Sequence, residues 1–276
     1  ARRVPYLLRS IGQLNHWSLR QSAGRKQMLL RLVERRNLQG AAALHFTSAA
    51  EQGEASRLRL GTPSFVLPLG VELQPLATTA GESQSEHWTG TTFLFLSRLH
   101  PKKQLELLFE ALALLRTRRP EARWRLQIAG EGDPAYVERL RDHSRQLGVE
   151  PHCHWLGFVG GERKQHLLSH ADWFVLPSAS ENFGIAAAEA LAAGTAVILA
   201  PGVAIAEAVS KAGAGLVVPA EAAALAAALE RALEPPPVAM AEAARRLVLD
   251  AYSWGAIAEQ LEQQYLCLLQ ARLARQ

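Results

Sequence analysis

Trp173-Phe-Val-Leu-Pro-Ser-Ala-Ser-Glu-Asn-Phe-Gly-Ile-Ala-Ala-Ala-Glu-Ala-Leu191 is the stretch that decides the fold. Its first four residues are apolar and suit a buried strand, and the apolar residues from about Phe183 onward suit a buried helix. A strand that leads through a short loop into a helix is the repeating unit of a parallel α/β sheet. Ligands of such sheets bind outside the carboxyl ends of the strands.

Strands and helices alternate along most of the chain. The predicted strands are residues 92–96, 123–129, 153–156, 173–176, 196–199 and 215–218, and the predicted helices include residues 105–117 and 134–147. The helix at 134–147 closes at Gly148, a residue type that helix ends prefer. This alternation predicts an α/β fold with a parallel sheet covered on both faces.

The first ninety residues are organised differently. Residues 4–8, 43–47 and 65–69 are predicted strands, a basic helix spans about 24–36, and the stretch from about 74 is rich in Thr, Ser, Gly and Glu. Three strands are too few for an independent doubly wound sheet. We therefore expect the second half of a first domain at residues 1–75, a linker at 76–90 and a complete second domain at 91–252.

The composition is that of an ordinary globular protein, with 49% hydrophobic and 20% charged residues among 276. The two cysteines, Cys153 and Cys267, match no metal or redox spacing, which favours a reducing compartment such as the cytoplasm. Residues 183–206 are apolar enough to suggest a membrane span, but Glu189 and Pro201 interrupt them. We interpret this stretch as a buried helix followed by a buried strand.

The first 36 residues carry nine basic side chains and the single acid Glu34. Such a segment could face anionic lipid head groups or a phosphorylated acceptor, which would place the protein at the inner face of a membrane. A solvated charged surface without a partner is the simpler alternative. With a net charge of only +4, no nucleic-acid partner is expected.

The loop and helix at 177–191 can form an anion site. The first amides of a helix that begins near Phe183 have no partner inside the helix, and the helix dipole favours a diphosphate there. The Glu189 carboxylate can accept two hydrogen bonds from a vicinal diol such as a ribose, and Glu181 can meet a sugar on the other side of the phosphates. Two such acids are often only a helix-start acid and a surface residue, but the surrounding Ser-Glu-Asn-Phe-Gly and Glu-Ala-Leu favour the functional interpretation.

Leu96-Ser-Arg-Leu-His-Pro-Lys-Lys103 follows the first strand of this domain and brings Arg98 and Lys103 beside the same cleft. A leaving nucleoside diphosphate gains negative charge as the glycosidic bond breaks, so fixed cations favour the transition state. The chain contains no Asp-x-Asp, a metal-chelating motif of many enzymes that use nucleotide sugars. We expect no metal or other cofactor, with Arg98 and Lys103 in the role of the metal; two ordinary surface bases are the alternative.

These motifs resemble the C-terminal domain of glycosyltransferase family 4, a retaining family with the GT-B fold of two Rossmann-like domains. The resemblance covers residues 91–219 and continues in the final helix at 253–276, which in the family returns to the first domain. Pro5-Tyr-Leu-Leu-Arg-Ser-Ile-Gly-Gln-Leu14 and Ala43-Leu-His-Phe-Thr-Ser-Ala-Ala-Glu51 resemble the second half of the family's acceptor domain. The family's glycine-rich first loop precedes this region, so we expect a chain that is truncated at its N-terminus and cannot complete the active site alone.

The resemblance implies roles for individual residues. Arg98 and Lys103 bind the donor diphosphate, Glu181 contacts the transferred sugar, and Glu189 holds the ribose hydroxyls. The other implied donor-binding residues are Gly130 and Gly132 at the cleft, Phe158 and Val159 at the nucleobase, and Asn182, Phe183, Gly184 and Ile185, which line the sugar and phosphates through their backbone.

The activity implied by the resemblance is metal-independent transfer of a sugar from a nucleoside diphosphate to a glycan or lipid-linked hydroxyl, with retention at the anomeric carbon. Surface polysaccharide or lipopolysaccharide synthesis is the expected setting. Two alternatives stay open. One is a truncated protein that binds nucleotide sugars without turnover, and the other is a GT-B sugar-nucleotide epimerase, which needs no acceptor.

Some residues depart from the family's pattern, and others are weak candidates for a site. Ser97 and Gln104 stand where the family usually has glycine, which puts the geometry of phosphate binding in doubt. His152 and His154 alternate on a predicted strand but lack a third metal ligand. His45 is more simply a packed or a surface side chain than a residue of the cleft. Gly130-Glu-Gly132 lacks the third glycine of a dinucleotide site.

Overall fold

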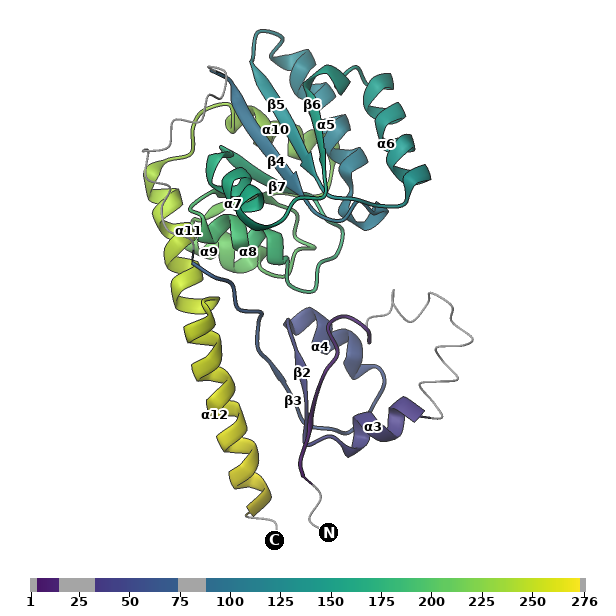
Figure 1. The fold of residues 1–276 in the computed structure, drawn as a ribbon, viewed down its shortest axis with the longest axis vertical. Helices are drawn as coiled ribbons and strands as arrows, with labels where there is room; N and C mark the ends of the chain where they lie inside the picture. Colours follow the sequence, from purple (N-terminus) through teal and green to yellow (C-terminus); the bar gives the residue numbers. More distant parts are fainter. Residues whose placement is uncertain (1–3, 15–32, 74–87, 274–276) are drawn as a thin grey trace. The chain divides into compact units, whose positions relative to one another are not determined.

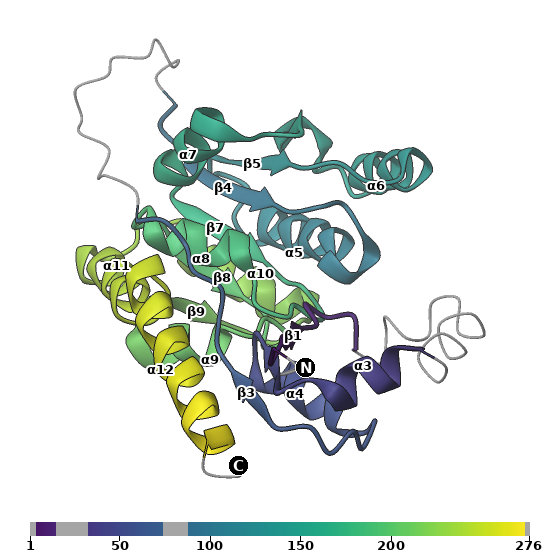
Figure 2. The ribbon, with the colours of Figure 1, turned by 60° about the horizontal axis from the view of Figure 1, so that its bottom comes forward.

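The computed structural model describes residues 4–14, 33–73 and 88–273 (Figure 1). The chain divides into two compact units, a smaller one of residues 1–70 with 254–276 and a larger one of residues 71–253. Each unit has its own parallel sheet (Figures 1 and 2).

The larger unit is built on a six-stranded sheet with the order β6-β5-β4-β7-β8-β9. Its strands are β4 (Thr91–Leu96), β5 (Trp124–Ala129), β6 (Cys153–Gly157), β7 (Trp173–Leu176), β8 (Ala196–Leu199) and β9 (Gly215–Val217). All neighbouring pairs are parallel. Because the chain crosses from β6 at one edge to β7 beside β4, the direction of winding reverses between β4 and β7, as in doubly wound folds.

Two groups of helices pack against this sheet (Figure 1). One group is α5 (Leu105–Arg118), α6 (Pro134–Gln146) and α10 (Ala222–Arg231), and the other is α7 (Gly161–His170), α8 (Ile185–Ala192), α9 (Ala206–Ala212) and α11 (Val238–Ala251). Helices on both faces explain why β4 is apolar at successive positions: Phe93, Leu94 and Phe95 all have no exposed surface. The predicted α/β architecture with a parallel sheet is confirmed.

The sequence locates the central elements well. Strands β7 and β8 coincide with the predicted ranges 173–176 and 196–199. The apolar stretch 183–206 contains α8 and β8, as interpreted, and among the described residues no helix combines the length and apolar character needed to cross a membrane.

The smaller unit has a three-stranded parallel sheet in the order β1-β2-β3. Its elements are β1 (Leu7–Arg9), α3 (Arg35–Gly40), β2 (Ala43–Phe46), α4 (Ala49–Ser56), β3 (Ser64–Val66) and the 20-residue α12 (Trp254–Leu273). Leu38, Leu44 and Phe46 are buried at the centre of its core. Most of the predicted basic helix at 24–36, most of the basic N-terminal segment and most of the predicted linker lie outside the described residues.

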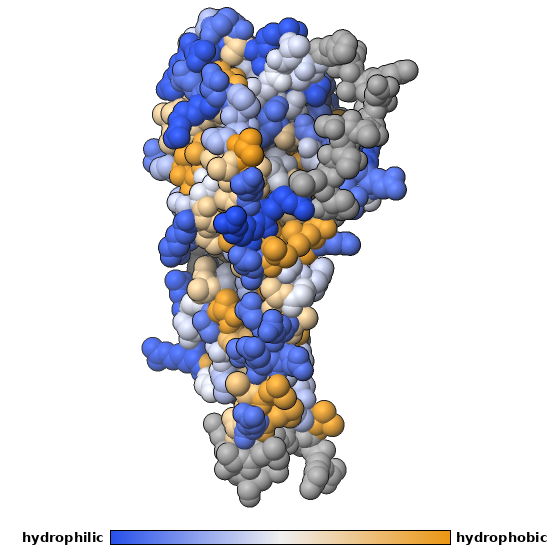
Figure 3. Space-filling view, turned by 90° about the vertical axis from the view of Figure 1, so that its left-hand side faces the viewer, coloured by the Kyte–Doolittle hydropathy of each residue, from blue (hydrophilic) through white to orange (hydrophobic). Residues whose placement is uncertain are grey.

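Helix α12 carries both polar and apolar side chains on its exposed surface. Tyr265, Leu266 and Leu269 are between 44% and 51% exposed. Figure 3 views the molecule from the side of α11 and α12 and shows apolar groups interspersed with hydrophilic ones.

A buried acid fixes the loop that follows β1. Glu51 is 1% exposed, and its carboxylate accepts hydrogen bonds from Ser10 Oγ at 2.6 Å, from Thr47 N at 2.8 Å and from Gly12 N. Burial alone would raise the pKa of Glu51, but the hydrogen bonds from Ser10, Thr47 and Gly12 outweigh it, so the pKa is lowered. The loop therefore depends on an ionised carboxylate.

Candidate functional site

A pocket opens in the larger unit where the winding of the sheet reverses. Leu96, Ala129 and Leu176, the last residues of β4, β5 and β7, contribute to its floor, and its volume is ≈ 640 Å³. The carboxyl ends of strands at such a reversal are where doubly wound sheets bind ligands. The lining residues are Leu96, Ser97, Arg98, Lys103, Ala129, Gly130, Glu131, Phe158, Val159, Gly160, Lys164, Leu176, Glu181, Gly184, Ile185, Ala186 and Glu189.

Helix α8 begins inside this pocket. Its N-cap is Gly184, with φ 94° and ψ 52°, and a Cβ there would meet Val203 Cγ1 at 2.7 Å. Ile185, Ala186 and Glu189 lie on the face of α8 that lines the pocket. The first amides of a helix have no carbonyl partner within it, so this end is a ready site for an anion.

The loops after β4, β5 and β6 are joined by backbone hydrogen bonds. Gly130 N donates to Gly157 O at 2.7 Å, and Leu99 N donates to Glu131 O at 2.8 Å. Gly130 has φ 143°, and a Cβ on it would lie 1.9 Å from Ser97 O. Glycine at this position is therefore required by the close approach of the two loops, which places Arg98 at the mouth of the pocket.

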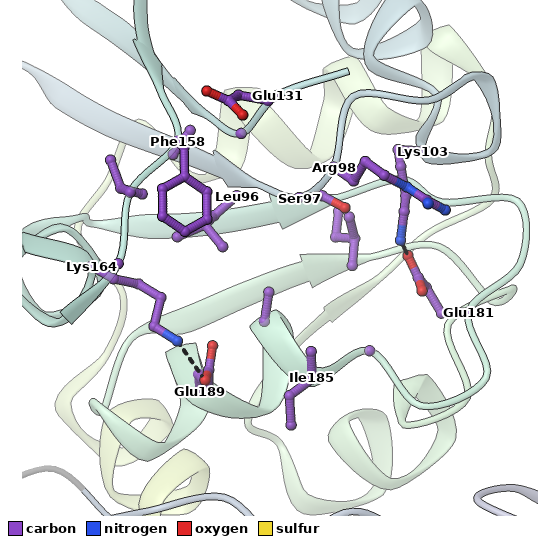
Figure 4. Close-up of a pocket in the computed structure, with 17 residues that line it drawn as sticks. Leu96, Ser97, Arg98, Lys103, Glu131, Phe158, Lys164, Glu181, Ile185 and Glu189 are labelled. Atoms are coloured by element: carbon purple, nitrogen blue, oxygen red, sulfur yellow. Dashed lines mark hydrogen bonds and ion pairs between the residues drawn. The ribbon is translucent and has the colours of Figure 1, made fainter. Parts of the chain in front are cut away.

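Lys103 and Glu181 form an ion pair at one end of the pocket, beside Arg98 (Figure 4). Lys103 ends a short 3-10 helix, η2 (Pro101–Lys103), and the side chains of the pair are 17% and 15% exposed. The buried Ser178 fixes the Glu181 loop, because its Oγ lies 2.9 Å from Lys102 O and 3.2 Å from Glu181 Oε1.

The positive charge around η2 also acts on His100, the residue that caps it. Burial lowers the pKa of His100, and the charges of Arg98, Lys102 and Lys103 lower it further. His100 Nδ1 accepts a hydrogen bond from Lys102 N at 3.2 Å, which requires that nitrogen to be unprotonated. His100 therefore serves as a neutral cap.

A second ion pair lies at the opposite end of the pocket (Figure 4). Lys164 Nζ, from the first turn of α7, is 2.7 Å from Glu189 Oε1, and the two side chains are 29% and 26% exposed. No pattern in the sequence points to Lys164. Lys164 and its neighbour Arg163 are alike in sequence, and only the rotational setting of α7 turns Lys164 to the pocket.

The structure brings most of the predicted site residues together. Nine of them line the pocket: Arg98, Lys103, Gly130, Phe158, Val159, Glu181, Gly184, Ile185 and Glu189. Gly132, Asn182 and Phe183 do not belong to the lining. Gly132 packs against Leu99, and the Phe183 ring is 3% exposed and makes an edge contact with Tyr252 at 5.4 Å. The ligand contacts predicted for all twelve residues stay predictions.

Two of the weaker candidates, His152 and His45, pack against aromatic rings. His152 stacks on Trp124, with ring centroids 4.3 Å apart, and among the described residues no group of three or more His, Cys, Asp or Glu could hold a metal ion. His45 is buried, its Nε2 lies 2.8 Å from Leu67 O, and its ring stacks on Phe65. His45 is thus packed, which is one of the two simpler alternatives.

A family of known proteins matches the part of the chain that contains this pocket. The family model described as "Glycosyl transferases group 1" matches residues 82–254. The phosphatidyl-myo-inositol mannosyltransferase of Mycobacterium tuberculosis is 34% identical over 141 residues, which are 50% of this chain and 35% of that protein. The mannosylfructose-phosphate synthase of Agrobacterium fabrum is 34% identical over 114 residues, 40% of this chain and 25% of that protein. The chain thus matches about a third or less of the length of these relatives.

Solved structures resemble nearly the whole chain. A sucrose-phosphate synthase from Thermosynechococcus elongatus gives a TM-score of 0.80 at 26% identity, over 98% of this chain and 69% of that one. Anabaena HepE in complex with UDP and glucose gives a TM-score of 0.76 at 20% identity, over 95% of this chain and 71% of that one.

Proposed function

The chain belongs to the glycosyl transferases group 1 family, and we propose that the protein uses the pocket of the larger unit to transfer a sugar from a nucleoside diphosphate to a hydroxyl acceptor. The GT-B fold predicted from the sequence is confirmed by the likeness to sucrose-phosphate synthase and HepE. The donor, the acceptor and the stereochemistry of transfer belong to the proposal.

The observation that carries the proposal is the arrangement of charges around the start of α8. Arg98, Lys103 and Glu181 lie at one end of the pocket and Glu189 at the other, with the free amides of α8 between them (Figure 4). A diphosphate at α8 would face the two cations and the helix dipole. Its sugar would then reach Glu181 and its ribose Glu189.

The exposed ring of Phe158 lines the same end of the pocket as Lys164 and Glu189 (Figure 4). Its side chain is 72% exposed, and an aromatic face of this kind can stack on a nucleobase. We place the base of the donor against Phe158 and the adjoining backbone of Val159. HepE, which shares the fold, is in complex with UDP and glucose, so uridine nucleotides are the first to test.

In the proposed reaction the bond between the anomeric carbon and the diphosphate oxygen breaks, and a bond to the acceptor oxygen forms on the same face. The acceptor proton passes to the departing phosphate oxygen, so no covalent sugar–enzyme intermediate is required. Arg98 and Lys103 stabilise the charge that develops on the diphosphate, because they attract the transition state more strongly than the ground state. Glu181 positions the sugar.

Other parts of the sequence-based expectation stay predictions. These are independence from metal, a glycan or lipid-linked acceptor, a role in surface polysaccharide or lipopolysaccharide synthesis, and a cytoplasmic location with membrane contact through the basic N-terminal segment.

A thermal-shift screen of UDP, GDP, ADP and their sugars identifies the donor, and two substitutions then test the site. Glu189→Ala should weaken binding of the nucleoside diphosphate by about tenfold or more, since a hydrogen bond to a charged group contributes about 1.5–3 kcal/mol. Glu181→Ala should reduce sugar transfer or donor hydrolysis without weakening nucleotide binding. Glu162→Ala removes an exposed acid of α7 that does not line the pocket and serves as the control.

The outcomes separate the alternatives. Equal and negligible effects of Glu189→Ala and Glu181→Ala in calorimetry and kinetics would refute the assignment of this pocket. Donor binding without any release or transfer of sugar would indicate a binding protein, and conversion of a UDP-sugar without an acceptor would indicate an epimerase.

A further inference from the structure

Lys164 lines the pocket, although no motif in the sequence predicts it there. Its ammonium group lies 2.7 Å from Glu189 Oε1, and both residues line the pocket. Lys164 sits in the first turn of α7, where its backbone N–H donates to Gly160 O at 3.3 Å. Gly160 follows Phe158 and Val159 in the loop that also lines the pocket, so the position of Lys164 is tied to that of the exposed Phe158 ring.

Phe158, Lys164 and Glu189 form one end of the pocket, away from Arg98, Lys103 and Glu181 (Figure 4). Glu189 is four residues beyond the start of α8 at Ile185, which corresponds to about 6 Å along a helix axis. That length separates a diphosphate at the helix start from a group bound at Glu189. A positive charge at Lys164 is therefore placed to act on the nucleoside end of a donor.

The chemistry of a ribose explains why a carboxylate and an ammonium group would stand together there. Each hydroxyl of a vicinal diol donates one hydrogen bond and also accepts. A carboxylate can only accept, and an ammonium group can only donate. Lys164 uses one of its three N–H groups on Glu189 and keeps two for other acceptors. The pair can therefore satisfy both roles of the diol, which Glu189 alone cannot.

We propose that Lys164 is a specificity-determining residue that binds the donor ribose together with Glu189. Glu189 accepts from a ribose hydroxyl, and Lys164 donates to a ribose hydroxyl oxygen while holding the carboxylate in place. The pair then selects a ribonucleotide over a nucleotide that lacks these hydroxyls. This inference rests on the proposed function, because it requires a nucleoside diphosphate in the pocket with its ribose at Glu189.

The test compares two ligands in calorimetry with the 276-residue chain. The ligands are the best-binding member of UDP, GDP and ADP and the 2′,3′-dideoxy form of the same nucleotide. The variant is Lys164→Met, which keeps the length of the side chain and removes its charge and its donors. Arg163→Met is the matched control, since it removes a basic group from the adjacent position of α7, where Arg163 is exposed and does not line the pocket.

The readout is the ratio of the two dissociation constants. Loss of the Lys164 charge also changes the field at the diphosphate, but that change acts on both ligands and cancels in the ratio. We expect Lys164→Met to reduce the preference for the ribonucleotide by about tenfold, the effect of one hydrogen bond to a charged group, and Arg163→Met to leave it unchanged. A role of Lys164 in the fold alone, without effect on the Glu189 carboxylate, would weaken both ligands and leave the ratio as it is.

The possible failures are distinguishable. An unchanged ratio in Lys164→Met, with nucleotide binding intact, overturns the role of Lys164 and leaves the proposed function standing. If the unsubstituted chain binds none of UDP, GDP and ADP, the proposed donor site falls and this inference falls with it.

Discussion

Lys103 and Glu181 form an ion pair, so the two residues should have opposite effects on the binding of an anion. Both side chains are largely buried, at 17% and 15% exposed, and both line the end of the pocket beside Arg98. A diphosphate at the start of α8 would be attracted by Lys103 and repelled by Glu181. We therefore expect Glu181→Gln to strengthen binding of the nucleoside diphosphate while it lowers sugar transfer.

The size of the effect follows from Coulomb's law. Two unit charges about 4 Å apart interact by about 1 kcal/mol in water and about 4 kcal/mol at the effective dielectric constant of a protein surface. For side chains that keep some exposure we take about 2 kcal/mol for each charge, a factor of about 30 in Kd. Lys103→Met should weaken binding by about that factor, and adding Glu181→Gln to Lys103→Met should restore most of it.

Isothermal titration calorimetry on four proteins tests this order. The expected affinity for the nucleoside diphosphate falls from Glu181→Gln, through the unsubstituted chain and the double variant, to Lys103→Met. Gln can still accept the hydrogen bond from Ser178, so the Glu181 loop should keep its structure. Lys102→Met removes the adjacent positive charge outside the pocket lining and is the control. If the double variant binds no better than Lys103→Met, Glu181 does not face the phosphates and the proposed placement of the donor is wrong.

Gly184 at the start of α8 and Glu51 beside the loop after β1 each hold local backbone structure in place. Gly184→Ala should destabilise the larger unit by about 1–3 kcal/mol, because it places a Cβ at positive φ and 2.7 Å from Val203 Cγ1. The same substitution should weaken diphosphate binding in calorimetry. Unchanged stability and affinity would contradict the described start of α8. Glu51→Gln should lower the free energy of unfolding by about 3 kcal/mol at pH 7, because an amide group replaces an acceptor surrounded by donors. The pKa of Glu51 is lowered in the folded chain, so its contribution to stability is complete above the ordinary carboxyl pKa and is lost as the pH falls through the folded pKa. In urea denaturation, the difference in free energy of unfolding between Glu51→Gln and the unsubstituted chain should therefore shrink below about pH 4. A difference that is independent of pH would show that ionisation of Glu51 is not involved.

The sequence predicts the elements of the larger unit because local signals there agree with the tertiary structure. Strands β7 and β8 are short apolar runs, buried on both faces, and their ends coincide with the predicted ends. The start of α8 is different: the helix begins at Ile185, two residues after the predicted start. Gly184 takes a left-handed conformation, and the Phe183 ring turns away to pack on Tyr252. No local pattern reports that contact, because Tyr252 lies far along the chain.

Contacts between residues distant in sequence also limit what can be predicted of the site. Arg98, Lys103, Glu181 and Glu189 could be predicted as neighbours because each follows a strand end or lies one turn into a helix, and parallel strands bring such positions to one edge of the sheet. Their pairing could not be predicted, because an ion pair depends on which side chains meet across two loops. Lys164 shows this most clearly, since the short loop before α7 runs between Gly157, the last residue of β6, and Gly161, the first residue of α7, and both have positive φ. Leu168 is the buried residue of α7, and Lys164, one turn before it, lies on a side of the helix that lines the pocket, which Arg163 does not. The packing of α7 therefore sets the chemistry at this end of the pocket as much as residue type does.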